Sequence, residues 1–238
     1  RIYLFKYKFQ MKIHAVIPFA SNYKSEKNSV SQRAKIILGG SSLIERSIQM
    51  LSKVESIDDI FVFTSDATIK KSLSSSLKYC FLKRDKSLDS PSVSIEEIIE
   101  SFFNLIETDI LVLLHPRKPF LKPSTIEECI LKVKKKSYDS SFIAKNYRRL
   151  AWYENKPINF DFKSKSTPHL EKLEPIQIEA STLYVIWKEK FLKTRSRIGK
   201  NPFIKEIGHF EGFEVDKRDD REIAELIINA GLDRNINE

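Results

Sequence analysis

Short apolar segments alternate with amphipathic segments along most of the chain, and this alternation constrains the fold more than any other feature. The apolar runs with the length and residue content of buried strands are 14–18, 60–64, 79–82 and 110–114. The segments with apolar residues at helical spacing are 42–53, 67–77 and 94–108. Helical crossovers of this length join parallel strands, so we expect an α/β fold with a mostly parallel sheet and helices on both faces.

The second half of the chain continues this pattern after one interruption. Further helices are expected at 125–136, 188–193 and 219–230, and further strands at 140–144, 180–187 and 210–216. Residues 147–175 are rich in aromatic residues, prolines and charges without a clear period, which indicates an inserted arm of the kind that forms dimers. We expect a single domain over 11–238, preceded by a non-native or disordered leader at 1–10, because Met11 directly precedes the first strand.

The composition excludes some classes of protein and leaves one alternative open. The formal net charge of +9 favours an anionic partner, but the basic residues are scattered and no nucleic-acid recognition motif accompanies them. A basic nucleic-acid-binding protein is therefore an alternative and not the main interpretation. Cys80 and Cys129 are too isolated for a disulfide framework, and no apolar run reaches the roughly 18 residues that a membrane span needs. We expect a cytoplasmic protein without a membrane partner.

Glu214 and Asp216 are the first candidates for a functional site. If 210–216 is a strand, both carboxylates point to one face, roughly 7 Å apart along the backbone. At an effective dielectric constant of about 20 they repel each other by about 2 to 3 kcal/mol, and a bound cation removes that cost. The alternative is a solvated polar face that alternates with buried Phe213 and Val215.

The loop after the first strand has the residue types that bind phosphate. Lys24 and Lys27 can pair with a triphosphate as point charges, while Ser21, Asn22 and the backbone N–H groups can surround it. The alternative is a solvated lysine-rich loop, since a loop poor in glycine approaches phosphate less closely.

Charged residues also follow the other strands. Arg117 and Lys118 come after the fourth apolar run and can bind a carboxylate or a phosphate, and His115 can donate a hydrogen bond at the same strand end. Arg84 follows the third run and can contact a nucleobase edge. The alternatives are a surface turn for Arg117 and Lys118, a structural role for His115 and a surface charge for Arg84.

Several segments together resemble the acylneuraminate (CMP-sialic acid) cytidylyltransferases. Residues 113–121 read LLHPRKPFL and keep both prolines of the family's LLQPTSPLR, and residues 181–186 read STLYVI, similar to its NGAIYII strand. Residues 213–216 read FEVD where the family has IDID, so that Glu replaces the first Asp. Residues 63–66 (FTSD) match the family's STD at the end of a strand, and residues 81–84 (FLKR) with 88–90 (LDS) are similar to the elements that line the nucleobase pocket. The resemblance extends from about Met11 to Ala230.

The resemblance implies a nucleotide-diphospho-sugar transferase-like fold and an activity. It implies a homodimeric enzyme that joins CTP to an acidic, sialic-acid-like keto sugar, releasing a CMP-sugar for surface glycan synthesis and pyrophosphate. Mg²⁺ would be held by Glu214 and Asp216, with Asp216 and Lys24 as the catalytic residues.

Further ligand contacts are implied at the other candidate positions. The nucleotide would contact Ser21, Asn22, Lys24, Lys27, Arg84 and Ser90. The sugar acid would contact His115, Arg117 and Lys118.

The nucleotide loop departs from the family pattern. Residues 18–28 read PFASNYKSEKN, without the arginine and the glycine of the family's PARxGSK. A non-catalytic nucleotide- or sugar-binding relative with a degenerate donor loop is therefore an alternative to the enzyme.

Overall fold

The computed structural model describes residues 11–20, 34–161 and 169–233. The expected leader at 1–10 and the candidate residues Ser21, Asn22, Lys24 and Lys27 lie outside these ranges. Within them, no helix combines the length and the apolar character that crossing a membrane requires.

A seven-stranded sheet forms the centre of the molecule, with the strand order β11-β7-β10-β6-β1-β4-β5. The strands are β1 (Ile13–Phe19), β4 (Asp59–Thr64), β5 (Cys80–Lys83), β6 (Ile110–Leu114), β7 (Ser140–Tyr147), β10 (Ile176–Trp187) and β11 (Pro202–Glu206). Only β10 is antiparallel to its neighbours β6 and β7, while the other pairs are parallel. The expected mostly parallel α/β sheet is confirmed.

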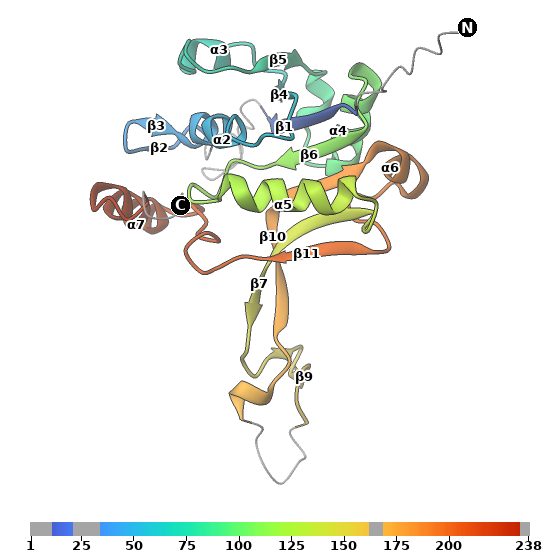
Figure 1. Ribbon diagram of the computed structural model, residues 1–238. Helices are drawn as coiled ribbons and strands as arrows, with labels where there is room; N and C mark the ends of the chain where they lie inside the picture. The colour runs from blue at the N-terminus through green and yellow to red at the C-terminus, as the bar shows by residue number, and fades with distance from the viewer. Residues whose placement is uncertain (1–10, 21–33, 162–168, 234–238) are drawn as a thin grey trace, which may run out of the picture.

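Helices cover both faces of this sheet (Figure 1). Those packed on the sheet are α2 (Leu43–Leu51), α3 (Ile69–Ser72), α4 (Ile95–Leu105), α5 (Pro123–Lys134) and α6 (Lys188–Thr194), while α7 (Arg218–Asn229) covers a separate, smaller cluster. Short 3-10 turns η1 (Lys86–Asp89) and η2 (Leu170–Lys172) complete the helical segments. Ser42 and Ser94 begin α2 and α4 with reciprocal capping boxes, which satisfy the first backbone N–H groups of each helix.

The alternation of side chains along β1 divides the main core into two layers. Ala15 and Ile17 pack in the cluster that contains the buried residues of α2, α3 and α5. Val16 points to the other face and packs in the cluster that contains the buried residues of α4 and α6. The strand is apolar throughout because both of its faces are covered.

A third, smaller cluster lies beneath α7 and connects two loops that are distant in sequence. Phe120, from the loop after β6, and Val215, from the segment before α7, are both buried in it together with Ala224 of α7. The rings of Phe120 and Phe210 are 4.8 Å apart between centroids. This packing holds the loop after β6 against the segment that carries Glu214 and Asp216.

Two expected elements differ from the structure, a helix that ends early and a strand that does not form. The helix predicted at 67–77 stops after α3, because Leu73 is extended and the backbone N–H of Ser74 bonds to Glu45 Oε1 at 2.9 Å. The serine-rich sequence that follows competes for backbone hydrogen bonds and disfavours a longer helix. The strand predicted at 210–216 is wrong, since these residues form turns and irregular chain. Val215 gives this segment its apolar alternation, but it is buried in the third cluster and not in a strand.

The edge strand β11 was not among the strands expected from the sequence. Its backbone pairs in parallel with β7, from Pro202 opposite Ser140 to Glu206 opposite Ala144. Pro202 is the first residue of an edge strand, a position where a missing N–H is tolerated.

The segment predicted as an arm stands away from the sheet (Figure 1). β7 and β10 continue past the body as a two-stranded ribbon with Tyr147 opposite Ile176, and the short strands β8 (Trp152–Tyr153) and β9 (Lys156–Pro157) follow near its tip. The side chains of Trp152, Tyr153 and Ile158 are 55%, 67% and 57% exposed. An arm is present, and its role in a dimer stays a prediction.

Candidate active site

The candidate site lies at the carboxyl-terminal edge of the parallel strands. β1, β4 and β6 run in the same direction, so the chain leaves all three at one edge, where open α/β sheets bind their ligands. The loop after β6 carries Arg117 and Lys118, and a backbone bond of 3.0 Å from Val215 N–H to Arg117 C=O attaches the segment before α7 to it.

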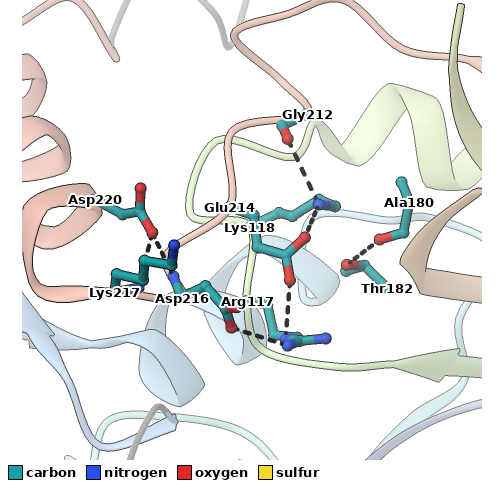
Figure 2. A network of polar contacts seen from close by, with 9 residues as sticks. All are labelled: Arg117, Lys118, Ala180, Thr182, Gly212, Glu214, Asp216, Lys217 and Asp220. Atoms are coloured by element: carbon teal, nitrogen blue, oxygen red, sulfur yellow. Dashed lines mark hydrogen bonds and ion pairs between the residues drawn. The ribbon is translucent and has the colours of Figure 1, made fainter. Parts of the chain in front are cut away.

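Glu214 and Asp216 meet Arg117 and Lys118 in one network of charges (Figure 2). Lys118 Nζ donates to Glu214 Oε2 at 2.7 Å, and Arg117 Nη2 donates to Asp216 Oδ1 at 3.0 Å. Arg117 Nε lies 3.1 Å from Glu214 Oε1, so the guanidinium bridges the two carboxylates. The residues predicted to hold a metal and two of those predicted to bind the sugar acid therefore contact one another.

Burial differs sharply within this network. The side chain of Lys118 is 1% exposed, whereas those of Glu214 and Asp216 are 29% and 46% exposed. Burial lowers the pKa of Lys118, the neighbouring Lys145 and Arg117 lower it further, and Glu214 opposes this shift. Glu214 is therefore the counter-ion that keeps a buried ammonium charged, a pairing whose loss typically costs about 3 to 5 kcal/mol.

Backbone contacts fix the carboxylate-bearing segment. The Asp220 carboxylate accepts hydrogen bonds from the backbone N–H groups of Asp216 at 3.1 Å and Lys217 at 2.7 Å. Asp220 thereby satisfies donors at the start of α7, where a negative charge is also favoured. The sequence signal for this contact is the acidic pair that follows FEVD.

His115 stands at the end of β6 beside the antiparallel strand β10. Its backbone N–H donates to Thr182 C=O at 2.8 Å, next to an irregularity in β10 where Ser181 has a φ of 47°. Burial, with Arg117 and Arg197 adding to it, lowers the pKa of His115 to about 4. The imidazole is therefore neutral at pH 7 and has one nitrogen that can accept a proton.

Arg84 is buried and does not lie on the surface. It is 3% exposed, and its Nη2 and Nε donate to Asp89 Oδ1 at 2.6 and 3.2 Å. Ser65 Oγ donates to the other oxygen of Asp89 at 2.5 Å, which joins the loops after β4 and β5. The nearby Ser90 Oγ lies 2.8 Å from Ser92 Oγ. The structure thus places Arg84 and Ser90 together at this edge, with the Arg84 guanidinium already engaged by Asp89.

Asp89 was not selected from the sequence as a site candidate, although its position five residues after Arg84 is a usable signal for an ion pair across a short turn. Lys35 is held 3.6 Å from Asp66 Oδ2 at the end of β4. Asp66 also accepts the backbone N–H of Thr68 at 2.9 Å, a local turn contact before α3, whose N-cap is Thr68.

The donor set at Glu214 and Asp216 does not fit a resident Mg²⁺. Among the residues that the structure describes, no group of three or more His, Cys, Asp or Glu side chains is placed to hold a metal ion. The two carboxylates here already neutralise Arg117 and Lys118, whose charges lie where a metal ion would lie. The contacts of this pair therefore disagree with the Mg²⁺ assignment made from the sequence, which is otherwise untested.

Comparison with known proteins gives a family and a fold. The family model described as cytidylyltransferase matches residues 34–194. No curated protein matches the chain.

Similar solved structures include enzymes that form cytidine nucleotides. A CMP:2-keto-3-deoxy-manno-octonic acid synthetase complexed with CTP is 13% identical, with 92% of this chain and 99% of that chain covered and a TM-score of 0.67. A 4-diphosphocytidyl-2C-methyl-D-erythritol synthase from Anaerococcus prevotii is 15% identical over 92% and 99%, with a TM-score of 0.59. The bifunctional IspDF from Campylobacter jejuni is 14% identical over 88% of this chain and 53% of its own, with a TM-score of 0.60. At these identities the likeness concerns the fold.

Proposed function

Because the chain belongs to the cytidylyltransferase family, we propose that it transfers a cytidylyl group from CTP to an acidic keto sugar in the cytoplasm, as a step of surface glycan synthesis. A hydroxyl oxygen of the sugar attacks the α-phosphorus of CTP. The bond from that phosphorus to the oxygen bridging to the β-phosphorus breaks, so the products are a CMP-sugar, pyrophosphate and one proton.

The observation that carries this proposal is the charged network of Arg117, Lys118, Glu214 and Asp216 at the ligand-binding edge of the sheet. Nucleotidyl transfer depends on positioning and on compensating the charge of the phosphates. Carboxylates that hold a guanidinium and an ammonium in fixed positions reduce the reorganisation needed when an anionic substrate arrives.

The acidic acceptor is supported by the character of the same edge. Arg117, with 22% of its side chain exposed, is a suitable partner for a sugar carboxylate, because a guanidinium binds carboxylates in a planar, two-point arrangement. His115 lies next to it, and its neutral imidazole can donate a hydrogen bond to the substrate. The synthetase of a keto sugar acid has the highest TM-score of the structures compared above.

The nucleotide is assigned to residues 21–27, which follow β1 in the sequence, and to the edge beside β4 and β5. Lys24 and Lys27 would neutralise the triphosphate and Ser21 and Asn22 would hydrogen bond to it, with Arg84 and Ser90 near the base. The Asp89 carboxylate that engages Arg84 limits that residue to an indirect role in shaping the base pocket.

The arm between β7 and β10 is proposed to bind a second copy of the chain. Trp152, Tyr153 and Ile158 expose large apolar surfaces on a ribbon that projects from the body, an arrangement typical of association surfaces. Sedimentation analysis of the wild type and of a Trp152→Ser/Tyr153→Ser variant tests this: the wild type should be a dimer and the variant a monomer.

Pyrophosphate release tests the enzymatic proposal. Protein, CTP and Mg²⁺ are incubated with keto sugar acids and, in a separate arm, with a polyol phosphate. Release with a keto sugar acid supports the proposal, release only with the phosphate changes the acceptor class, and no release with any acceptor contradicts the activity. Lys24→Ala should abolish release, with Lys78→Ala as the matched control.

Thermal shift separates the remaining alternatives. A non-catalytic nucleotide-binding relative should melt at a higher temperature with CTP alone, since a ligand that binds only the folded state stabilises it. A shift with an oligonucleotide but not with CTP would instead favour the nucleic-acid alternative.

A further inference from the structure

We propose that the Lys118 ammonium and the Arg117 guanidinium take the place of a resident divalent cation between Glu214 and Asp216, so that the chain binds no Mg²⁺ of its own before a nucleotide arrives. The inference concerns the site of the proposed function, and it rests on that function only in assigning the site to nucleotide transfer.

The carboxylate oxygens of Glu214 and Asp216 already have cationic partners. Glu214 Oε2 accepts from Lys118 Nζ at 2.7 Å, and Glu214 Oε1 forms an ion pair, without a hydrogen bond, with Arg117 Nε at 3.1 Å. Asp216 Oδ1 accepts from Arg117 Nη2 at 3.0 Å. A Mg²⁺ ion needs oxygen ligands at about 2.0 to 2.1 Å in a near-octahedral arrangement. To lie between the two carboxylates it would have to displace Arg117, which bridges them, and compete with Lys118 for Glu214.

Lys118 cannot easily be displaced. Its side chain is 1% exposed, and its only other hydrogen bond given by the described residues is a long one of 3.5 Å to Gly212 C=O. Moving Glu214 onto a metal would leave this ammonium buried without its counter-ion, which is strongly unfavourable. Glu214 is therefore best described as a positioning residue that holds Lys118 and orients Arg117.

The charges of the two carboxylates are already balanced by neighbouring cations. Two carboxylates face Arg117 and Lys118, and Lys145 is close enough to lower the pKa of Lys118. Positive charge at this position therefore equals or exceeds negative charge before any metal is added. A pair of free carboxylates attracts a divalent cation, but a neutralised pair does not.

The same contacts explain why residue 214 is a glutamate and not an aspartate. A glutamate is one methylene longer than an aspartate, and its carboxylate reaches the buried Lys118 while Arg117 spans the distance to Asp216 (Figure 2).

Titration of nucleotide-free protein with Mn²⁺, followed by the electron paramagnetic resonance signal of the free ion, tests the inference without requiring turnover. The wild type should leave the Mn²⁺ signal at its level in buffer. Lys118→Met removes the charge and keeps much of the apolar volume, so it frees the carboxylates and should bind one Mn²⁺ per chain. The double variant Lys118→Met/Glu214→Gln should lose that binding.

Two outcomes would overturn the inference. One is stoichiometric Mn²⁺ binding by the wild type that Glu214→Gln abolishes, since the pair would then be a metal site as it stands. The other is a folded Lys118→Met protein that binds no Mn²⁺, which would remove the role given to Lys118. If circular dichroism shows that Lys118→Met does not fold, Arg117→Gln replaces it, because it frees an oxygen of each carboxylate at a more exposed position. Neither readout depends on pyrophosphate release, so a failure of the proposed function is distinguishable.

Discussion

Arg84 and Asp89 form an ion pair that is nearly closed to solvent: Arg84 Nη2 lies 2.6 Å from Asp89 Oδ1, and their side chains are 1% and 9% exposed. Ser65 Oγ occupies the second carboxylate oxygen. Removing one partner of such a pair leaves the other buried and uncompensated, so Arg84→Met should lower the free energy of unfolding by about 3 to 5 kcal/mol. Urea denaturation measures this, with Lys83→Met at an exposed neighbouring position as the control.

A double-mutant cycle with Asp89→Asn separates this role from direct contact with a nucleobase. The combined loss of stability should be smaller than the sum of the single losses, because both changes break the same pair. Additive losses of stability would contradict the ion-pair role. A loss of CTP affinity in Arg84→Met at unchanged stability would favour the base-contacting role predicted from the sequence.

Glu214 and Asp216 should differ in their effect on stability although they share Arg117. Glu214→Gln leaves the buried Lys118 without a counter-ion and should cost about 3 kcal/mol or more. Asp216→Asn affects a carboxylate that is 46% exposed and should cost less than about 1 kcal/mol. Thermal and urea unfolding of the two variants give the comparison, and equal losses would mean that Lys118 does not depend on Glu214.

The regular part of the fold was readable from the sequence because burial on both faces makes parallel strands continuously apolar. The expected run 110–114 coincides with β6, and the expected helix 188–193 differs from α6 by one residue. Apolar alternation was misleading at 210–216, where Val215 is buried by a small side cluster instead of by sheet pairing. Apolar periodicity indicates which residues are buried, but not whether sheet pairing or another element buries them.

The residues of the charged network were found in the sequence, but their relationship was not. Glu214 and Asp216 were interpreted as a pair facing a metal, and Arg117 and Lys118 as ligands of the sugar acid. The contact between the two groups depends on the backbone bond from Val215 to Arg117 and on the burial of Lys118. Neither feature has a local sequence signal, because each depends on contacts between segments almost a hundred residues apart.

His115 should make the folded state sensitive to mild acid. Its pKa is lowered from 6.5 to about 4, so between these values the unfolded chain binds a proton that the folded protein does not. The stabilisation is complete above about pH 6.5 and is lost as the pH falls towards 4, by at most about 3 kcal/mol. His14, whose pKa is lowered in the same direction by burial, adds to the loss.

Comparison with His115→Gln isolates that contribution, since His14 is present in both proteins. Free energies of unfolding are measured at pH 7.5, 6, 5 and 4. The loss on acidification should be larger in the wild type than in the variant, and parallel curves would show that His115 titrates alike in the folded and unfolded states.

The two cysteines should differ in their reaction with a thiol reagent. Cys80 is exposed, whereas Cys129 of α5 is fully buried, and burial raises the pKa of its thiol to about 12. The thiolate is the reactive form, so at pH 8 the folded protein should release one equivalent of chromophore from 5,5′-dithiobis(2-nitrobenzoate), and the second only in denaturant. Cys80→Ser should remove the first equivalent. Cys129 packs in the core between α5 and the sheet, so its reaction in that variant requires the helix to separate from the sheet. The slow rate of Cys129 modification should therefore increase with urea, as the rate of unfolding does. Rapid modification of Cys129 without denaturant would contradict the packing of α5.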